Sequence, residues 1–370
     1  MYRKYLLIAV FLMMAALFVS CNTDKNVSTD VSTAVTIQTT DTKTYITTKT
    51  TIDMTTGDTT ADNNVPLMPS QSVGTTDDFL LPADGIRPIA VMIDNEGSRS
   101  LPQGGLDKAQ IIYEVIIEGG ETRLMPVFWN TNVQMIGPVR SSRHYFLDYA
   151  MEYDAIYVHF GWSPMAQKDI SKLKINNING VTYGGKIFWS LTNNKGNWQD
   201  SYTSMQKIIN YIKEVKYRTN TDKKPVFTYN QSDLALINGQ KADKISIGYS
   251  SSYTCGYEYD SASGFYMRLR KGVPHMERVS GKQLVVKNII IQYTKNSAIK
   301  GDDKGRQELN TVGSGKGYYI TDGNAIKIKW SKSSRNAQTQ YTDGTGNTIV
   351  LNPGQTWVQV VPISGKVSVN

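Results

Sequence analysis

The stretch YYITDGNAIKIK, residues 318–329, is typical of a β-hairpin. Its two β-rich runs flank Asp322-Gly323, and an Asp-Gly pair favours the positive φ angles of a two-residue hairpin turn. After the turn, Lys327 and Lys329 alternate with isoleucines, so one face of the second strand is apolar and the other is basic. The pattern predicts antiparallel β structure with one buried face.

Similar patterns continue on both sides of this hairpin, from residue 223 to the C-terminus. Strand-like runs are separated by turn signals such as Ser263-Gly264 and Pro353-Gly354, without helix signals between them. We therefore expect residues 223–370 to form an all-β domain, a small barrel or sandwich with a basic surface. The expected strands cover residues 226–229, 244–249, 265–270, 284–293, 317–321, 325–330, 348–351 and 356–361.

Residues 81–222 combine strand and helix signals instead. Together these signals favour an α/β domain with a mixed sheet and flanking helices. The expected strands are the apolar runs 88–93, 111–117, 123–129 and 155–160, the middle two joined at Gly119-Gly120 as a hairpin. The expected helices are 141–152, one that begins after Ser163-Pro164, and one that follows the capping-box pattern of residues 203–206.

Residues 21–80 have a different composition. Residues 23–60 contain sixteen Thr and one Tyr, without Trp or Phe. Such a segment cannot bury enough apolar surface to offset the entropy lost on ordering, so we expect a disordered tether. The tether would hold the folded body away from a membrane.

Residues 1–20 resemble the signal peptide of a bacterial lipoprotein. Arg3 and Lys4 precede the apolar stretch 6–18, which is too short to span a bilayer but suits a signal peptide. Ser20 and Cys21 then match a lipidation site, although an ordinary signal peptide or a signal anchor remains an alternative. We expect cleavage before Cys21 and a diacylglyceryl, palmitate-carrying anchor on the extracytoplasmic face of the cell membrane, since two acyl chains anchor stably.

The net charge of +8 is unevenly distributed. The signal carries +2, residues 22–80 carry −5 and residues 81–370 carry +11. A basic body on a membrane tether favours anionic partners such as lipid headgroups or wall polymers, and nucleic acid is not expected outside the cell. A lysine-rich surface without a specific partner is the alternative. With one Cys beyond Cys21 and three His, we expect no metal site and no cofactor.

The first candidate site lies in the stretch GPVRSSRH, residues 137–144. A turn is expected to lead into a helix whose first amides have no intrahelical partners. Arg140, Ser141, Ser142 and Arg143 would then form an anion-binding site from amides, a helix dipole and guanidinium groups. The alternative is a Ser-capped helix with exposed arginines.

The second candidate site consists of polar residues at the ends of expected strands. Asp94, Glu118 and His159 would line one cleft beside Arg140 at the carboxyl edge of the sheet and could perform acid–base catalysis. The alternative makes Asp94 a turn residue and His159 a hydrogen-bonded core residue. In the C-terminal region, Trp357 and the segment 330–335 combine aromatic rings with cations, which suits either glycan binding or packing.

Several motifs resemble the YerB-like lipoproteins of Gram-positive bacteria. The matching segments are residues 87–95, 113–114, 118–123, 137–143, 326–332 and 351–358. The resemblance covers about residues 84–363 and implies an exported lipoprotein with a mixed N-terminal domain, a β-rich C-terminal domain and no established activity. One departure is the segment 195–204, which lacks the proline-histidine-asparagine element that the resemblance leads us to expect.

The leading hypothesis is a non-enzymatic envelope lipoprotein that binds an anionic or glycan component or another envelope protein. The chain lacks the local motifs of serine hydrolases, zinc proteases and nucleotide-binding loops. The alternative is a glycan or wall-polymer hydrolase or transferase that uses Asp94, Glu118 and His159. A third hypothesis, a solute-binding lipoprotein, is disfavoured by the all-β character of the second region.

Overall fold

The computed structural model describes residues 35–40, 43–48, 79–192, 197 and 199–370. The chain divides into two units, residues 1–68 and 69–370. In the first unit, β1 (Val35–Thr40) and β2 (Lys43–Thr48) pair antiparallel. The expected signal peptide, Cys21, most of the expected tether and part of the segment 195–204 lie outside the described residues.

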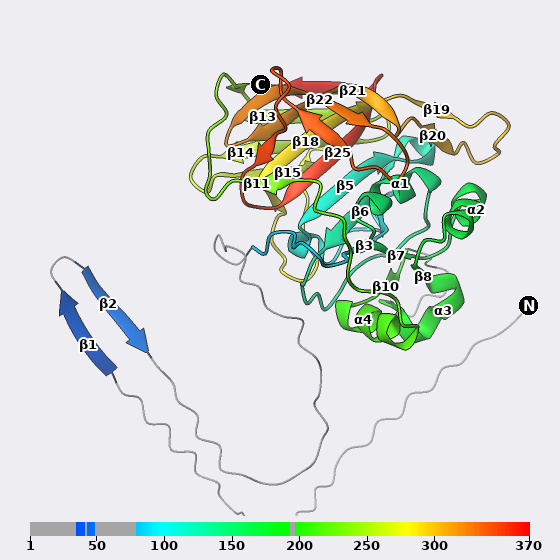
Figure 1. The fold of residues 1–370 in the computed structure, drawn as a ribbon, viewed down its shortest axis with the longest axis horizontal. Coiled ribbons are helices and arrows are strands. Elements are labelled where there is room, and N and C mark those ends of the chain that lie inside the picture. The colour runs from blue at the N-terminus through cyan, green and yellow to red at the C-terminus, as the bar shows by residue number, and fades with distance from the viewer. Residues whose placement is uncertain (1–34, 41–42, 49–78, 193–196, 198) are drawn as a thin grey trace, which may run out of the picture. The chain divides into compact units, whose positions relative to one another are not determined.

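The second unit contains one large sheet of twelve strands (Figure 1). The strands from the N-terminal region are β3 (Ile89–Val91), β4 (Ile93–Asp94), β5 (Ile111–Ile116), β6 (Thr122–Phe128), β7 (Ile156–His159) and β8 (Asn177–Asn179). The strands from the C-terminal region are β12 (Gln240–Lys241), β18 (Asn288–Thr294), β21 (Gly313–Thr321), β22 (Asn324–Lys332), β23 (Gln340–Thr342) and β25 (Thr356–Pro362).

Strand β25 joins the two regions, because it pairs in parallel with both β5 and β18. Hydrogen bonds of one sheet therefore connect residues before and after position 222. The described core residues all lie in this unit, between Ile89 and Val361, so residues 69–370 have a hydrophobic core of their own. We expect this fragment to fold alone, while a division into separately folding domains after residue 222 stays a prediction.

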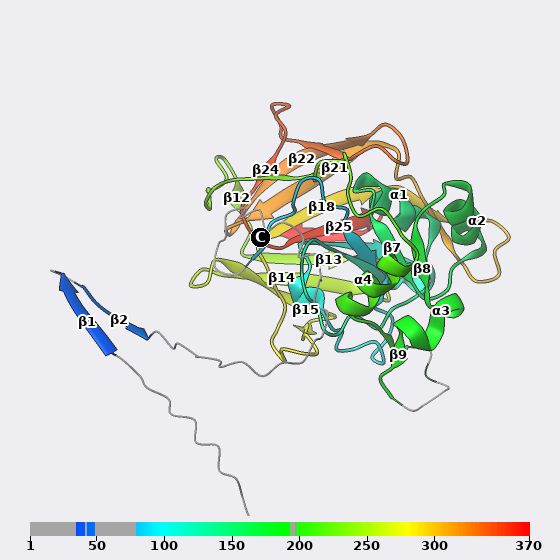
Figure 2. The same ribbon diagram turned by 60° about the horizontal axis from the view of Figure 1, so that its bottom comes forward.

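A second sheet of six strands lies against the C-terminal part of the large one (Figures 1 and 2). It consists of β13 (Lys244–Gly248), β14 (Thr254–Asp260), β15 (Phe265–Arg270), β16 (Val273–Pro274), β17 (Val285–Val286) and β26 (Lys366–Val369). The remaining ladders are β9 (Trp189–Ser190) with β10 (Ser201–Tyr202), β11 (Thr228–Tyr229) with β24 (Val350–Leu351), and β19 (Asn296–Ala298) with β20 (Gln307–Leu309).

The four α-helices of the described chain all come from the N-terminal region. They are α1 (His144–Glu152), α2 (Pro164–Lys172), α3 (Gly180–Ile187) and α4 (Met205–Glu214), and two 3-10 turns cover Leu106–Lys108 and Glu118–Gly120. The expected fold class, a mixed α/β region followed by a strand-rich region, is confirmed. Among the described residues, no helix is long and apolar enough to cross a membrane.

Local signals were correct where one turn or cap decides the structure. Asp322 (φ 47°) and Gly323 (φ 68°) form the expected hairpin turn between β21 and β22. Ser163 caps α2 by accepting the Ala166 N–H at 3.2 Å, with Pro164 in the first turn. Helix α4 is capped by Ser204, one residue later than the capping-box pattern indicated.

Candidate functional site

Asp94 and Arg140 form the first pair of the predicted polar cluster. Asp94 ends β4 with its side chain fully buried, and its Oδ2 lies 3.3 Å from Arg140 Nε and 2.9 Å from the Gln199 amide nitrogen. Burial lowers the pKa of the Arg140 guanidinium to about 10, although the Asp94 carboxylate opposes the shift. The structure therefore brings together one residue from each of the two predicted sites.

Arg143 and Glu118 form the second pair. Arg143 Nε donates to Glu118 Oε2 at 2.9 Å, and Arg143 Nη2 is paired with the other carboxylate oxygen, a bidentate geometry. Glu118 stands in the 3-10 turn between β5 and β6. The arginines predicted to bind an anion thus each hold a carboxylate of the chain itself.

The backbone around Ser141 differs from the expected helix start. The segment before α1 is extended, so the Arg140 N–H donates to Met92 O at 2.8 Å and the Ser142 N–H to Gly161 O at 3.0 Å. The helix begins at His144, after an extended Arg143 without a side-chain cap. The expectation of unpaired helix amides at Ser141 and Ser142 was wrong, because both residues precede the helix. Anion binding by the four residues stays a prediction.

A phosphate titration tests this prediction. If an anion displaces Glu118 or Asp94 from the arginines, inorganic phosphate should raise the melting temperature of residues 69–370 in a saturable way. Replacing Arg140 and Arg143 with Lys keeps the charge but removes the bidentate geometry, so this variant should lose the effect. Lys213→Arg on α4 serves as control, and an unchanged phosphate response in the double variant would exclude this anion site.

His159 is enclosed in the sheet. Its ring nitrogens lie 2.7 Å from Gly161 O and 3.1 Å from Asn177 Oδ1, and burial lowers its pKa. Within the described residues it hydrogen-bonds neither Asp94 nor Glu118. The geometry matches a hydrogen-bonded core histidine. Acid–base catalysis by Asp94, Glu118 and His159 stays a prediction, and no hydrogen bond joins His159 to either carboxylate in the described residues.

A different surface carries unpaired positive charge. A groove of about 920 Å³ lies between the end of β18, the start of β21 and the residues before and within β26. Its lysines are Lys295, Lys316 and Lys366, all exposed, and its described lining contains no Asp or Glu. None of the three lysines forms an ion pair within the part of the chain that the structure describes. We call this surface the lysine groove.

The floor of the lysine groove is aromatic. Trp330 is 3% exposed, and its Nε1 donates to Tyr293 O at 3.0 Å. Gly315 opposite it has no side chain, and a Cβ there would stand 2.5 Å from the indole nitrogen, so only glycine fits. The sequence indicated Trp330 and the basic C-terminal region. No sequence pattern indicates that three lysines from distant segments lie around one groove.

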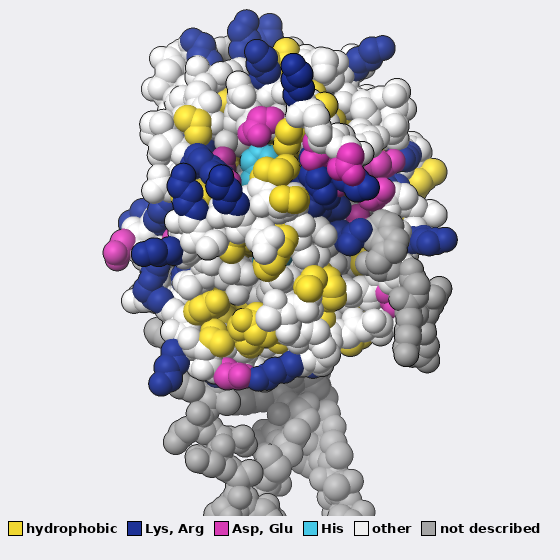
Figure 3. All heavy atoms as spheres, turned by 90° about the vertical axis from the view of Figure 1, so that its right-hand side faces the viewer, with side chains coloured by type: hydrophobic (Ala, Val, Ile, Leu, Met, Phe, Trp, Pro, Cys, Tyr) yellow, Lys and Arg dark blue, Asp and Glu magenta, His cyan; other side chains and the backbone are white. Residues whose placement is uncertain are grey.

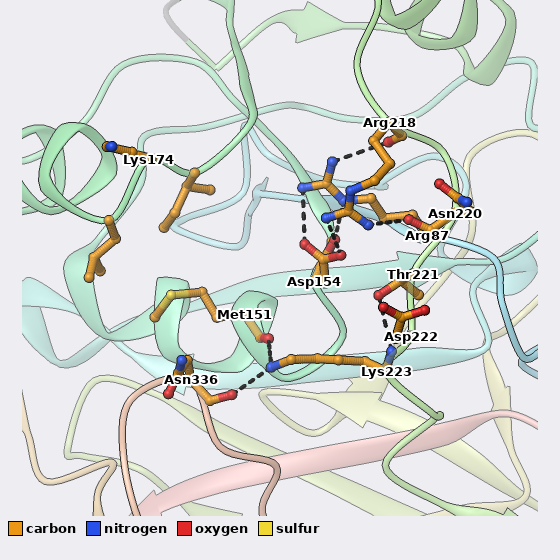
Figure 4. A pocket seen from close by; sticks show the side chains of 13 residues that line it. Arg87, Met151, Asp154, Lys174, Arg218, Asn220, Thr221, Asp222, Lys223 and Asn336 are labelled. Carbon is orange, nitrogen blue, oxygen red and sulfur yellow. Dashed lines mark hydrogen bonds and ion pairs between the residues drawn. The ribbon is translucent and has the colours of Figure 1, made fainter.

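Another pocket contains acidic as well as basic side chains. In a pocket of about 400 Å³, Asp154 accepts from both Arg87 and Arg218, and Lys223 Nζ donates to Met151 O and Asn336 O at 2.6 and 2.5 Å (Figure 4). On the face shown in Figure 3, basic and acidic side chains lie beside a histidine. The lysine groove differs from the pocket in having no acidic lining residue.

Two family models match the chain. A family model described as "Protein of unknown function (DUF3048) N-terminal domain" matches residues 82–218, and the corresponding C-terminal domain model matches residues 245–358. The chain is 32% identical over 277 residues to the "Putative lipoprotein YerB" of Bacillus subtilis (strain 168), an alignment that covers 75% of this chain and 81% of that relative.

The fold also matches a solved structure. The crystal structure of the YerB protein from Bacillus subtilis superposes with a TM-score of 0.68 and 28% sequence identity, and it covers 77% of this chain and 94% of that one. Both folded regions are therefore shared with a structurally characterised relative. The chain belongs to the DUF3048 family, the two-domain family that includes YerB of Bacillus subtilis.

Proposed function

We propose that the protein is a lipid-anchored binding module on the extracytoplasmic face of the cell membrane, where its lysine groove holds an anionic component of the envelope. The observation that carries the proposal is the lysine groove itself: three exposed lysines without an acidic residue in its described lining. The lipoprotein-type signal at Cys21 and the likeness to a lipoprotein support the anchor.

The lysine groove suits a polymer with repeated negative charges. Lys295, Lys316 and Lys366 belong to three separate segments, and each lysine near an anionic surface contributes about 1 kcal/mol. Val312 and Ile363 at its rim are 41% and 65% exposed and offer apolar contact to the carbon skeleton of a polymer. Such binding weakens with ionic strength because surface charges are screened.

The alternative, a hydrolase or transferase, has less support. It requires Asp94, Glu118 and His159 to exchange protons with a substrate, yet two of these groups are held by arginines and the third is enclosed. An uncharged glycan or a protein partner could occupy the lysine groove instead. The binding experiment below compares an anionic polymer with an uncharged one.

We expect residues 69–370 to be retained on immobilised poly(glycerol phosphate) and to elute with rising salt. Changing Lys295, Lys316 and Lys366 together to Gln should weaken binding about 100-fold, because each lysine is expected to contribute about 1 kcal/mol to the binding free energy. The control variant replaces the exposed Lys213, Lys224 and Lys241 with Gln, which alters net charge equally. Equal losses in both variants would show non-specific attraction, and preferential retention on uncharged dextran would contradict an anionic ligand.

A further inference from the structure

The outer face of the β21–β22 hairpin carries exposed lysines beyond those of the lysine groove. Lys327 and Lys329 of β22 are exposed and alternate with the buried Ile328 and Trp330. Every second residue of a strand points to the same side, so the two lysines share the solvent face at a spacing of about 7 Å. Lys316 of β21 is also exposed and stands opposite Lys329 in the register of the hairpin. We call Lys316, Lys327 and Lys329 the lysine ladder.

Lys316 and Lys329 place two like charges across the hairpin. Residues directly opposite each other in antiparallel strands have Cβ atoms about 5 Å apart, and like charges at such positions destabilise the strand pair. None of the three ladder lysines forms an ion pair within the part of the chain that the structure describes. A polar outer face is ordinary for an antiparallel sheet, but it does not require cations to face each other. A bound anion would neutralise this repulsion.

The other outward positions of the hairpin beside the ladder are neutral. Ser314 stands opposite Ser331, and both are exposed. At the other end of the ladder, the half-buried Tyr318 stands opposite Lys327. Hydroxyl groups can donate hydrogen bonds to anionic oxygens without adding a negative charge. The outer face formed by residues 314–318 and 327–331 therefore carries positive and neutral side chains only.

Asp343 follows the strand that borders the ladder on its other side. Strand β23 pairs with β22 and places Thr342 opposite Lys329. The Asp343 Oδ1 accepts the Thr345 hydroxyl at 2.7 Å and the N–H groups of Thr345 and Asn347 at 2.9 and 3.0 Å. These hydrogen bonds hold the carboxylate within its own turn. Among the described residues, no ion pair joins Asp343 to the ladder.

The lysine ladder and the lysine groove share Lys316. This residue lines the groove with Lys295 and Lys366, and it stands opposite Lys329 on the ladder. The positive surface therefore continues from the groove onto β22. A small anion in the groove contacts the groove lysines alone, whereas a longer chain of negative charges can extend from Lys316 to Lys327.

We propose that the lysine ladder extends the binding surface of the groove, so that a linear anionic polymer seated in the groove continues across β21 and β22 with its charges on Lys329 and Lys327. This inference rests on the proposed function, because it assumes the same class of ligand. It adds a selection for length: a long polymer gains from both sets of lysines, and a short one does not. The gain falls with ionic strength, since exposed charges are screened.

Affinities for poly(glycerol phosphate) of two lengths test the ladder, measured with residues 69–370 at low salt. The ladder variant, Lys327→Gln with Lys329→Gln, should bind long chains about 30-fold more weakly, from the contribution of two lysines near an anionic ligand. A fragment of two repeating units has fewer charges than the groove has lysines, so its affinity should change less than about twofold. The control, Lys168→Gln with Lys172→Gln, removes two exposed lysines of α2 and should bind both lengths normally.

The melting temperature separates a loss of binding from a loss of folding. The ladder variant should melt no lower than the unchanged fragment, because it removes the repulsion between Lys316 and Lys329. Three results would overturn the proposal: full affinity of the ladder variant for long chains, an equal loss with the two-unit fragment, or an equal loss in the α2 control. Full affinity of the variant that lacks Lys295, Lys316 and Lys366 would instead contradict the proposed function, so the two failures are distinguishable.

Discussion

An Arg268→Met variant of residues 69–370 should lose about 3–5 kcal/mol of unfolding free energy. Arg268 Nη2 donates to Glu114 Oε2 at 2.7 Å, and both side chains are fully buried. Burial alone would raise the pKa of Glu114, but Arg268 and neighbouring hydroxyl groups hold it below its ordinary value. Without Arg268, a charged carboxylate would remain in the core without its counter-ion.

Further contacts of Arg268 increase the expected loss. The guanidinium lies over the Trp357 ring at 3.9 Å, and its Nε donates to His275 Nδ1 at 3.1 Å. Together with the Glu114 ion pair, the Trp357 contact connects β15 of the smaller sheet with β5 and β25 of the large one. The variant should therefore weaken the packing between the two sheets as well as the ion pair.

Urea unfolding of the fragment measures this effect. Arg99→Met, at an exposed position, should stay within about 0.5 kcal/mol of the unchanged protein. Adding Glu114→Gln to Arg268→Met should recover part of the loss, because a neutral amide is less costly to bury than a charge. A loss below about 1 kcal/mol in Arg268→Met would show that the buried pair contributes little.

The features predicted correctly from the sequence are those set by neighbouring residues. The turn at Asp322-Gly323 and the cap at Ser163 depend on one or two side chains and their backbone angles. In contrast, β25 lies between β5 and β18, and no local periodicity indicates which distant strands pair. Strand β14 (Thr254–Asp260) was missed, since its Gly and acidic residues interrupt the apolar pattern.

The same distinction applies to the candidate sites. The ion pairs of Arg140 and Arg143 were not predicted, because Asp94 and Glu118 come from distant segments and because the two arginines precede α1 on an extended segment instead of sharing one helix face. Asp94 was expected in a cleft beside Arg140, and the structure shows the two side chains in contact. The basic charge of the C-terminal region was visible in the sequence, whereas the position of Lys295, Lys316 and Lys366 around one groove follows from the meeting of three separate segments.

Replacing Lys332 should cause the second large loss of unfolding free energy, and the pH dependence of this loss identifies its cause. Its Nζ donates to Glu152 Oε1 at 2.7 Å, both side chains are fully buried, and the Thr339 hydroxyl donates to the same oxygen at 2.6 Å. The pair joins the end of β22 to the last turn of α1. Lys332→Met should cost about 3 kcal/mol at pH 8, because Glu152 would lose its counter-ion.

The loss should shrink on acidification. Burial already raises the pKa of Glu152 in the folded protein, and Lys332 opposes that shift. Removing Lys332 therefore raises the folded-state pKa further above the unfolded one. A carboxyl group with a raised folded pKa contributes stability that is present below its unfolded pKa and is lost as pH rises through the folded pKa. The variant should thus be closer to the unchanged protein at pH 5 than at pH 8.

Unfolding free energies measured at pH 5 and pH 8 distinguish a loss caused by the charge of Lys332 from one caused by its packing. Lys329→Met, at an exposed position on the same strand, should differ from the unchanged protein by less than about 0.5 kcal/mol at both. Combining Lys332→Met with Glu152→Gln should recover stability mainly at pH 8, where the carboxylate would be charged. An equal loss at pH 5 and pH 8 would mean that the packing of the lysine side chain between α1 and β22, rather than its charge, stabilises this contact.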